Sequence, residues 1–150
     1  MNTHPLFNQP ANGYRRLFRW LPMLLWMAAI FFISAQPSQE LPNLGSWDLF
    51  SKKLLHFIAY AILATLALWG IDRGKQLAPS KEWGPFLLAF LITLLYAMSD
   101  EYHQTFVPSR HGMAWDVLID SCGGIAALFL IWWRKRIKLE QAATSMAELP

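Results

Sequence analysis

The side chains best able to do chemistry are concentrated in one short stretch, SDEYHQTFVPSRHG, which follows a long uncharged apolar run. Its polar members include Asp100, Glu101, His103, Gln104 and Arg110. Carboxylates and imidazoles act as general acids and bases, and a guanidinium holds a phosphate or carboxylate through two parallel hydrogen bonds. Glu101 and His103 are therefore the candidates for a catalytic base, and binding of an anionic group is the alternative chemistry.

Two further polar sets occur elsewhere in the chain at helical spacing. KKLLHFIAY places Lys53, His56 and Tyr60 at i, i+3 and i+7, on one face of a helix. MAWDVLID places Asp116 and Asp120 one turn apart. The candidate binding residues are thus Lys53, His56, Tyr60, Asp100, Glu101, His103, Gln104, Arg110, Asp116 and Asp120.

None of these residues has the spacing of a recognised metal or nucleophile motif. The sequence lacks HExxH and paired cysteines, and it lacks G-x-S-x-G and Ser-x-x-Lys arrangements. We therefore predict no metal and no cofactor. The single cysteine, Cys122, excludes an intrachain disulfide and is expected to be a buried helix-packing residue.

The composition is that of a membrane protein. Hydrophobic residues make up 55% of the 150 residues and charged residues 15%, whereas soluble proteins carry about 25% charged residues. Mean hydropathy is +0.26 and there are eight Trp, a residue enriched at membrane interfaces. The basic residues cluster between apolar runs and form no continuous stripe, which argues against a nucleic-acid partner.

Four apolar runs are long enough to cross a bilayer as helices. They lie at about residues 18–35, 54–71, 83–98 and 113–133. About 20 helical residues cross a 30 Å hydrocarbon core, and only helices or closed barrels satisfy their backbone hydrogen bonds in lipid. We predict an all-α membrane protein, with a four-helix transmembrane domain over residues 18–133, an N-terminal segment over 1–17, and a basic, then flexible tail over 134–150.

The distribution of basic residues predicts the orientation. Ten of the 13 Lys and Arg flank the start of the first run, the second-to-third loop and the end of the fourth run, and three lie on the other side. By the positive-inside rule both termini are cytoplasmic, and the chemistry-bearing stretch faces outward. The first run lacks a clear small-x-small cleavage site, so we expect it to be retained.

The acids of the fourth run need partners inside the bundle. With a helix starting near residue 113, Asp120 lies about 10 Å inside, where a carboxylate costs about 2.5–3.5 kcal/mol by insertion scales. Gly123, Gly124 and Ala127 follow, and small residues let helices approach closely. Either a binding site or a structural network of neutralised charges would account for this pattern.

The motifs resemble those of VanZ-like membrane proteins. KLLHFIAYAIL is similar to that family's K-x-x-H-F-x-x-Y signature, and LLYAMSDEYHQTFVPSRHGMAWDVLIDSCGG is similar to its D-E-x-H-Q-x-F-x-P-G-R…D-x-x-x-N-x-x-G block. FFISAQPS resembles the end of the family's first span, and the resemblance covers about residues 20–133. The matching positions are Lys53, His56, Phe57, Tyr60, Asp100, Glu101, His103, Gln104, Phe106, Pro108, Arg110, Asp116 and Gly123.

Three positions depart from the family pattern. Lys52 stands where an acid often precedes the Lys, Ser109 replaces the Gly before the Arg, and Asp120 replaces an Asn. The serine predicts a turn that does not require positive φ. The extra acid predicts that Asp116 or Asp120 is protonated or paired with Arg110.

The resemblance implies a multi-pass protein of the bacterial inner membrane, in a family named after a member associated with teicoplanin resistance. Three functions stay open at this point. The protein is an envelope factor that binds a lipid or lipidated amphiphile at the outward-facing polar site, a membrane-embedded enzyme acting on lipid-linked substrates, or a structural assembly partner that could form oligomers.

Overall fold

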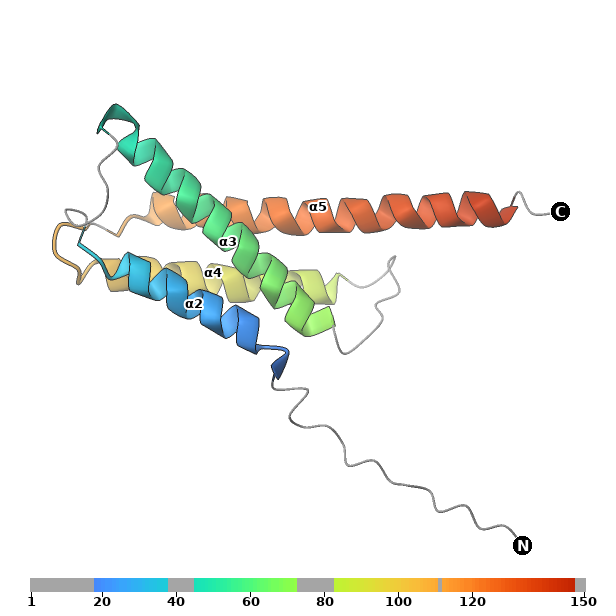
Figure 1. The fold of residues 1–150 in the computed structure, drawn as a ribbon, viewed down its shortest axis with the longest axis horizontal. Helices are drawn as coiled ribbons and strands as arrows, with labels where there is room; N and C mark the ends of the chain where they lie inside the picture. The colour runs from blue at the N-terminus through green and yellow to red at the C-terminus, as the bar shows by residue number, and fades with distance from the viewer. Residues whose placement is uncertain (1–17, 38–44, 73–82, 111, 148–150) are drawn as a thin grey trace, which may run out of the picture.

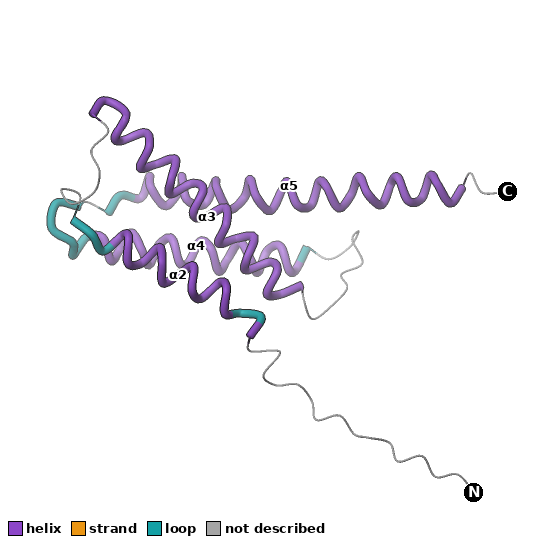
Figure 2. Tube along the Cα trace, viewed as in Figure 1, coloured by secondary structure: helices purple, strands orange, loops and turns teal. Residues whose placement is uncertain are grey.

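A computed structural model describes residues 18–37, 45–72, 83–110 and 112–147. The described residues form helices joined by turns, with no strand among them (Figure 2). The helices are α2 (Leu21–Ser34), a short 3₁₀ helix η1 (Gly45–Trp47), α3 (Asp48–Asp72), α4 (Gly84–Gln104) and α5 (Ala114–Ala147). The predicted all-α class is therefore confirmed.

Three of the helices, α3, α4 and α5, are long and apolar enough to cross a membrane. Helix α2 is apolar throughout but has only 14 residues. The outer surface of the helices is also apolar. Large side chains such as Phe32, Leu55 and Leu95 are more than 60% exposed. A surface of this kind is suited to lipid, and the chain is a multi-pass membrane protein.

The helices run past one another so that four of their ends meet. In Figure 1, α4 and α5 lie side by side in opposite directions, α3 crosses them at an angle, and α2 lies along α4. The most extensive packing joins α3 to α5. The ends of α2 and α4 and the beginnings of α3 and α5 consequently gather at one end of the bundle, on the left of Figure 1.

The α3–α5 contact is close because glycines face it. A methyl group on Gly123 would overlap the backbone carbonyl of Phe57, and one on Gly124 would meet the Thr93 side chain of α4 at 3.1 Å. The predicted role of these small residues in close helix approach is confirmed. The same geometry turns Cys122 outward, so the prediction of a buried thiol was wrong.

Polar side-chain contacts also join the helices at other positions along the bundle. The indole N–H of Trp26 on α2 donates to the carbonyl oxygen of Ala59 on α3 at 2.9 Å. Lys135 of α5 pairs with Asp72, the last residue of α3, at 2.9 Å. These contacts hold α2 and α5 against α3, which is the central helix of the bundle.

Helix α5 extends well past the predicted end of the fourth apolar run. The prediction of a flexible tail differs from the structure, because the helix continues to Ala147. An i, i+4 ion pair between Arg136 and Glu140 (3.3 Å) supports these turns, as does the alanine-rich sequence that follows. Figure 1 shows this part of α5 projecting beyond the other helices.

Candidate functional site

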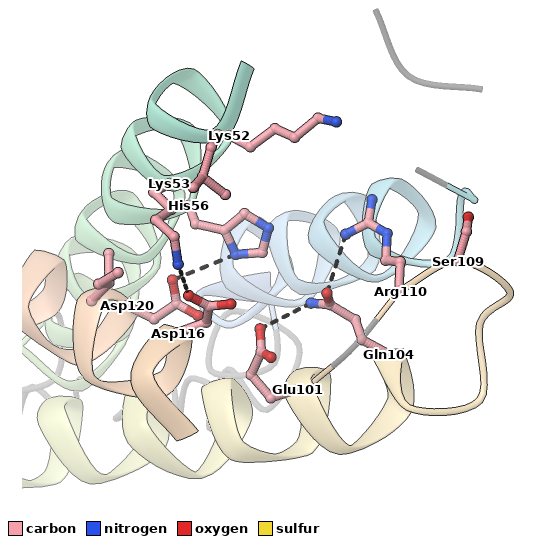
Figure 3. A pocket seen from close by; sticks show the side chains of 11 residues that line it. Lys52, Lys53, His56, Glu101, Gln104, Ser109, Arg110, Asp116 and Asp120 are labelled. Carbon is pink, nitrogen blue, oxygen red and sulfur yellow. Dashed lines mark hydrogen bonds and ion pairs between the residues drawn. The ribbon is translucent and has the colours of Figure 1, made fainter. Parts of the chain in front are cut away.

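A polar cavity of about 150 Å³ lies where the four helix ends meet. Its lining comes from α3, α4, α5 and the loop between α4 and α5 (Figure 3). The lining residues are Leu49, Lys52, Lys53, His56, Glu101, Gln104, Ser109, Arg110, Asp116, Ile119 and Asp120. Seven of the ten predicted site residues are among them, so the sequence-distant polar sets do meet in one place.

One ion pair and one imidazole–carboxylate contact line the side of the cavity formed by α3 and α5. The Lys53 ammonium group pairs with the Asp116 carboxylate, and both side chains are partly exposed. One turn deeper, Nδ1 of His56 lies 3.4 Å from Oδ1 of Asp120. The His56 side chain is 25% exposed, whereas that of Asp120 is fully buried. Each acid thus has a partner on α3, in place of the pairing with Arg110 that the sequence offered as one option.

Glu101 connects the end of α4 to the beginning of α5. Its carboxylate is buried, with Oε1 accepting from the Gln104 amide at 3.1 Å and Oε2 accepting from the backbone N–H of Met113 at 3.0 Å. The connecting chain passes close to this helix end, because a methyl group on Gly112 would overlap the Glu101 carbonyl. The orientation of the Glu101 side chain is therefore fixed by both of its neighbours.

Arg110 is held at the edge of the cavity by three oxygen acceptors. It donates from Nη1 to Gln104 Oε1 at 3.2 Å, from Nε to the carbonyl of Gln36 at 2.9 Å, and from Nη2 to the carbonyl of Ile33 at 3.3 Å. Partial burial lowers the pKa of Arg110 from its ordinary value, and the carboxylates of Asp100 and Glu101 oppose this shift. A guanidinium starts from so high a pKa that it stays charged.

Three of the predicted site residues lie outside the cavity lining. Asp100 is buried against α2, where Oδ2 accepts from the Ser34 hydroxyl at 2.8 Å. Tyr60 is fully buried and its ring stacks on His56 with 6.2 Å between centroids. The His103 ring packs on Phe31 at 4.5 Å, so this candidate base faces α2 and does not share the cavity with Glu101.

The residues contributed by the end of α2 and the turn after it were not among the predicted site residues. Ser34 donates to Asp100, and the backbone of Ile33 and Gln36 accepts from Arg110. All three lie in FFISAQPS, which resembles the end of the family's first span. That resemblance is the one sequence feature that could have pointed to these residues. Backbone acceptors carry no side-chain signature, so their role needed the structure.

The turn before Arg110 differs from the prediction. Ser109 has φ = +60°, the left-handed region in which glycine carries no steric penalty. The prediction that this turn needs no positive φ was wrong, because the loop must reverse direction to bring Arg110 back to Gln104. Serine adopts the conformation that the glycine of the family pattern would adopt more easily.

Replacing Ser109 with glycine should therefore stabilise the protein. Relief of left-handed strain at a non-glycine residue is worth about 1 kcal/mol or more, which exceeds the added entropy of the unfolded chain. We expect a higher melting temperature in thermal unfolding followed by tryptophan fluorescence. The matched control is Ser51→Gly, inside α3, which should lower the melting temperature because glycine destabilises a helix interior. Equal or lower stability of Ser109→Gly would contradict the strain.

Three of the cavity residues also lie close enough together to share a cation. His56, Glu101 and Asp120 each offer one ligand atom, and these atoms lie within 4.8 Å of one another. Imidazole and carboxylate groups are the usual ligands of zinc, manganese and iron in sites without cysteine.

The fold and the site define a multi-pass helical membrane protein with a cavity of paired charges at one end of the bundle. A sequence model of the VanZ/LLP1 family matches residues 18–135, and the chain belongs to this family. The family resemblance of the motifs is thereby confirmed. Comparisons with curated proteins and with solved structures find no match.

Proposed function

We propose that the protein binds the anionic head group of a lipid or lipidated amphiphile of the bacterial envelope in the polar cavity. The observation that carries this proposal is the position of Arg110, which three oxygens hold beside the cavity at the end of lipid-suited helices. Lys52 and Lys53 line the same cavity, and arginine binds phosphate or carboxylate in a bidentate manner.

The surroundings of the cavity suit a ligand with an acyl chain. Exposed apolar side chains such as Leu49, Leu55 and Phe106 lie on the helices and loop that form it. A head group could then occupy the cavity while its chain stays in the bilayer, and hydrophobic burial contributes about 0.8 kcal/mol per CH₂ group. Binding of lipidated glycopeptides, and with it a resistance-like role, would follow from the same arrangement.

The proposal includes four spans, two cytoplasmic termini and a cavity that faces outward from the inner membrane. In the sequence, ten of the 13 Lys and Arg precede α2, separate α3 from α4 or follow Trp133, and by the positive-inside rule this distribution supports the orientation. The contacts of α2 support its spanning role, because Trp20 packs at Gly70 near the end of α3 and Ser34 bonds to Asp100 at the other end of the bundle. From Trp20 to Ser34 the chain covers about 21 Å at 1.5 Å per residue, less than the 21- to 34-residue neighbours cover, so the proposal has α2 cross the membrane as a short span.

Native mass spectrometry of the detergent-purified protein tests head-group binding directly. The protein is mixed with phosphatidylglycerol or with phosphatidylcholine of the same acyl chains, in separate titrations. We expect tighter binding of the anionic lipid, and a soluble phosphate monoester should compete if the phosphate itself is recognised. Equal binding of the two lipids would contradict the proposal.

A membrane-embedded enzyme is the second candidate, favoured by the presence of Glu101 and His56 in one cavity. A buried, hydrogen-bonded carboxylate beside an imidazole can move protons to and from a substrate. His103, the other predicted base, is less favoured because it faces α2.

Glu101→Gln separates the two candidates. The enzyme predicts that a lipid or lipid-linked wall precursor changes in amount only in cells expressing wild type, at matched protein levels, in a host without its own homologue. Untargeted mass spectrometry of envelope lipids measures this. Under the binding proposal we expect identical profiles for both proteins, and a species dependent on Glu101 would instead establish turnover.

A further inference from the structure

We propose that His56, Glu101 and Asp120 bind one divalent first-row transition-metal ion, such as Zn²⁺ or Mn²⁺, at the inner end of the polar cavity. This goes beyond head-group binding and does not depend on it. The three residues come from α3, α4 and α5, so the ion would join the three longest helices at one point.

The distances among the ligand atoms suit such an ion. Ligands about 2.1 Å from zinc lie about 3.4 Å apart in a tetrahedral site, and ligands on opposite sides of an ion about 4.2 Å apart. Nδ1 of His56 and Oδ1 of Asp120 already lie 3.4 Å apart, and all three ligand atoms lie within 4.8 Å of one another. Closing the widest pair by at most about 1.4 Å would give the tetrahedral spacing, and by about 0.6 Å the spacing of ligands on opposite sides of an ion.

The burial of Asp120 independently points to a cation. The side chain is fully buried and lines the cavity, and neither carboxylate oxygen accepts a hydrogen bond from the residues that the structure describes. A buried carboxylate without compensation is destabilising by several kcal/mol, and the contact with one partly exposed imidazole leaves Oδ2 without a partner. Figure 3 shows the Asp120 carboxylate directed toward His56.

The charges around the cluster favour a divalent ion. When both are ionised, Glu101 and Asp120 together carry two negative charges, which a divalent ion balances. The nearby ammonium of Lys53 is already paired with Asp116 and so repels the ion less. One imidazole and two carboxylates form a donor set used for zinc, manganese and iron.

The contacts behind the ligands hold them in place as in known metal sites. Gln104 and the backbone of Met113 each donate to one oxygen of Glu101, and each oxygen keeps a lone pair for a metal. The His56 ring lies against Tyr60, which restrains its orientation. Three protein ligands beside an open cavity leave a coordination position for water or for an oxygen of a bound molecule.

Metal titration of chelator-treated, dialysed protein tests the site, with ZnCl₂ and MnCl₂ used separately and bound metal measured by plasma mass spectrometry. We compare wild type with Asp120→Asn and with the matched control Asp72→Asn, whose carboxylate pairs with Lys135 at the far end of α3. We expect about one equivalent in wild type and in Asp72→Asn. Affinity should fall at least tenfold in Asp120→Asn, and the metal should raise the melting temperature of wild type but not of that variant.

His56→Gln provides a second variant if Asp120→Asn fails to fold, and it should show the same loss. The proposal is overturned if wild type binds no metal, or if the ligand variants retain as much as wild type. Phosphatidylglycerol binding is measured in parallel with EDTA present. Binding that persists in EDTA while the metal titration fails would overturn the metal site alone, and metal binding without lipid selectivity would overturn the head-group proposal alone.

Discussion

Replacing Gly123 with alanine should lower the free energy of unfolding by about 2–3 kcal/mol, in the range found when extra atoms are forced into a packed interior. The added methyl group would overlap the carbonyl of Phe57. This neighbour is backbone, so no rotamer change relieves the overlap and α3 must move away from α5. Alanine is the better helix former by about 1 kcal/mol, and this gain is outweighed.

The change should reach the site as well as the stability. His56 precedes Phe57 on α3, and Asp120 lies one turn before Gly123 on α5. Separation of the two helices therefore separates the His56–Asp120 pair, which stands at 3.4 Å. Thermal unfolding followed by tryptophan fluorescence measures the first effect, and metal or lipid titration the second.

The matched control for this prediction is Gly84→Ala. Gly84 begins α4, and a methyl group there meets no atom of the described residues within 4 Å. The control should melt at or slightly above the wild-type temperature. If Gly123→Ala also melts like wild type, the two helices do not approach as closely as the structure indicates.

Arg110→Gln should weaken phosphatidylglycerol binding about 30- to 100-fold, which corresponds to about 2–3 kcal/mol, the lower part of the range for loss of one partner of a charge-assisted contact because Arg110 is only partly buried. Arg110→Lys keeps the charge but loses the two-pronged donor geometry. We therefore expect it to bind with an affinity between those of wild type and Arg110→Gln. Lipid titration by native mass spectrometry ranks the three proteins.

Two further measurements make the Arg110 result specific. Arg134→Gln removes the same charge from an exposed position of α5 far from the cavity, and it should bind like wild type. Arg110→Gln also loses the hydrogen bonds to Ile33 and Gln36. Thermal unfolding of this variant measures how far that loss lowers its stability, separately from its lipid affinity. Unchanged lipid affinity in a folded Arg110→Gln protein would contradict the head-group proposal.

Helical periodicity predicts which residues share a face, and this part of the site could be read from the sequence. Lys53 and His56 lie on one face of α3, and Asp116 and Asp120 on one face of α5, and the structure pairs these two faces in register. The registration depends on Gly123 as the point of close approach, and the sequence already indicated small residues there.

Periodicity also divides the end of α4 into two faces without telling which one lines the cavity. Glu101 and Gln104 face the cavity, whereas Asp100 and His103 face α2. The distinction depends on where α2 packs, a long-range contact that local spacing does not encode. The positive φ of Ser109 was missed for a related reason, since loop closure rather than residue preference imposes it.

The length of α5 has a consequence for how its last turns form. Its 34 residues extend about 51 Å, against a hydrocarbon core of about 30 Å, so some 20 Å of it extends beyond the core. A free peptide of that length would be marginally helical because starting a helix is unfavourable. Here the embedded turns provide the nucleus and the exposed turns only extend it. Helix α5 thereby forms a stiff extension, onto which a C-terminal reporter could be fused well away from the lipid and the cavity.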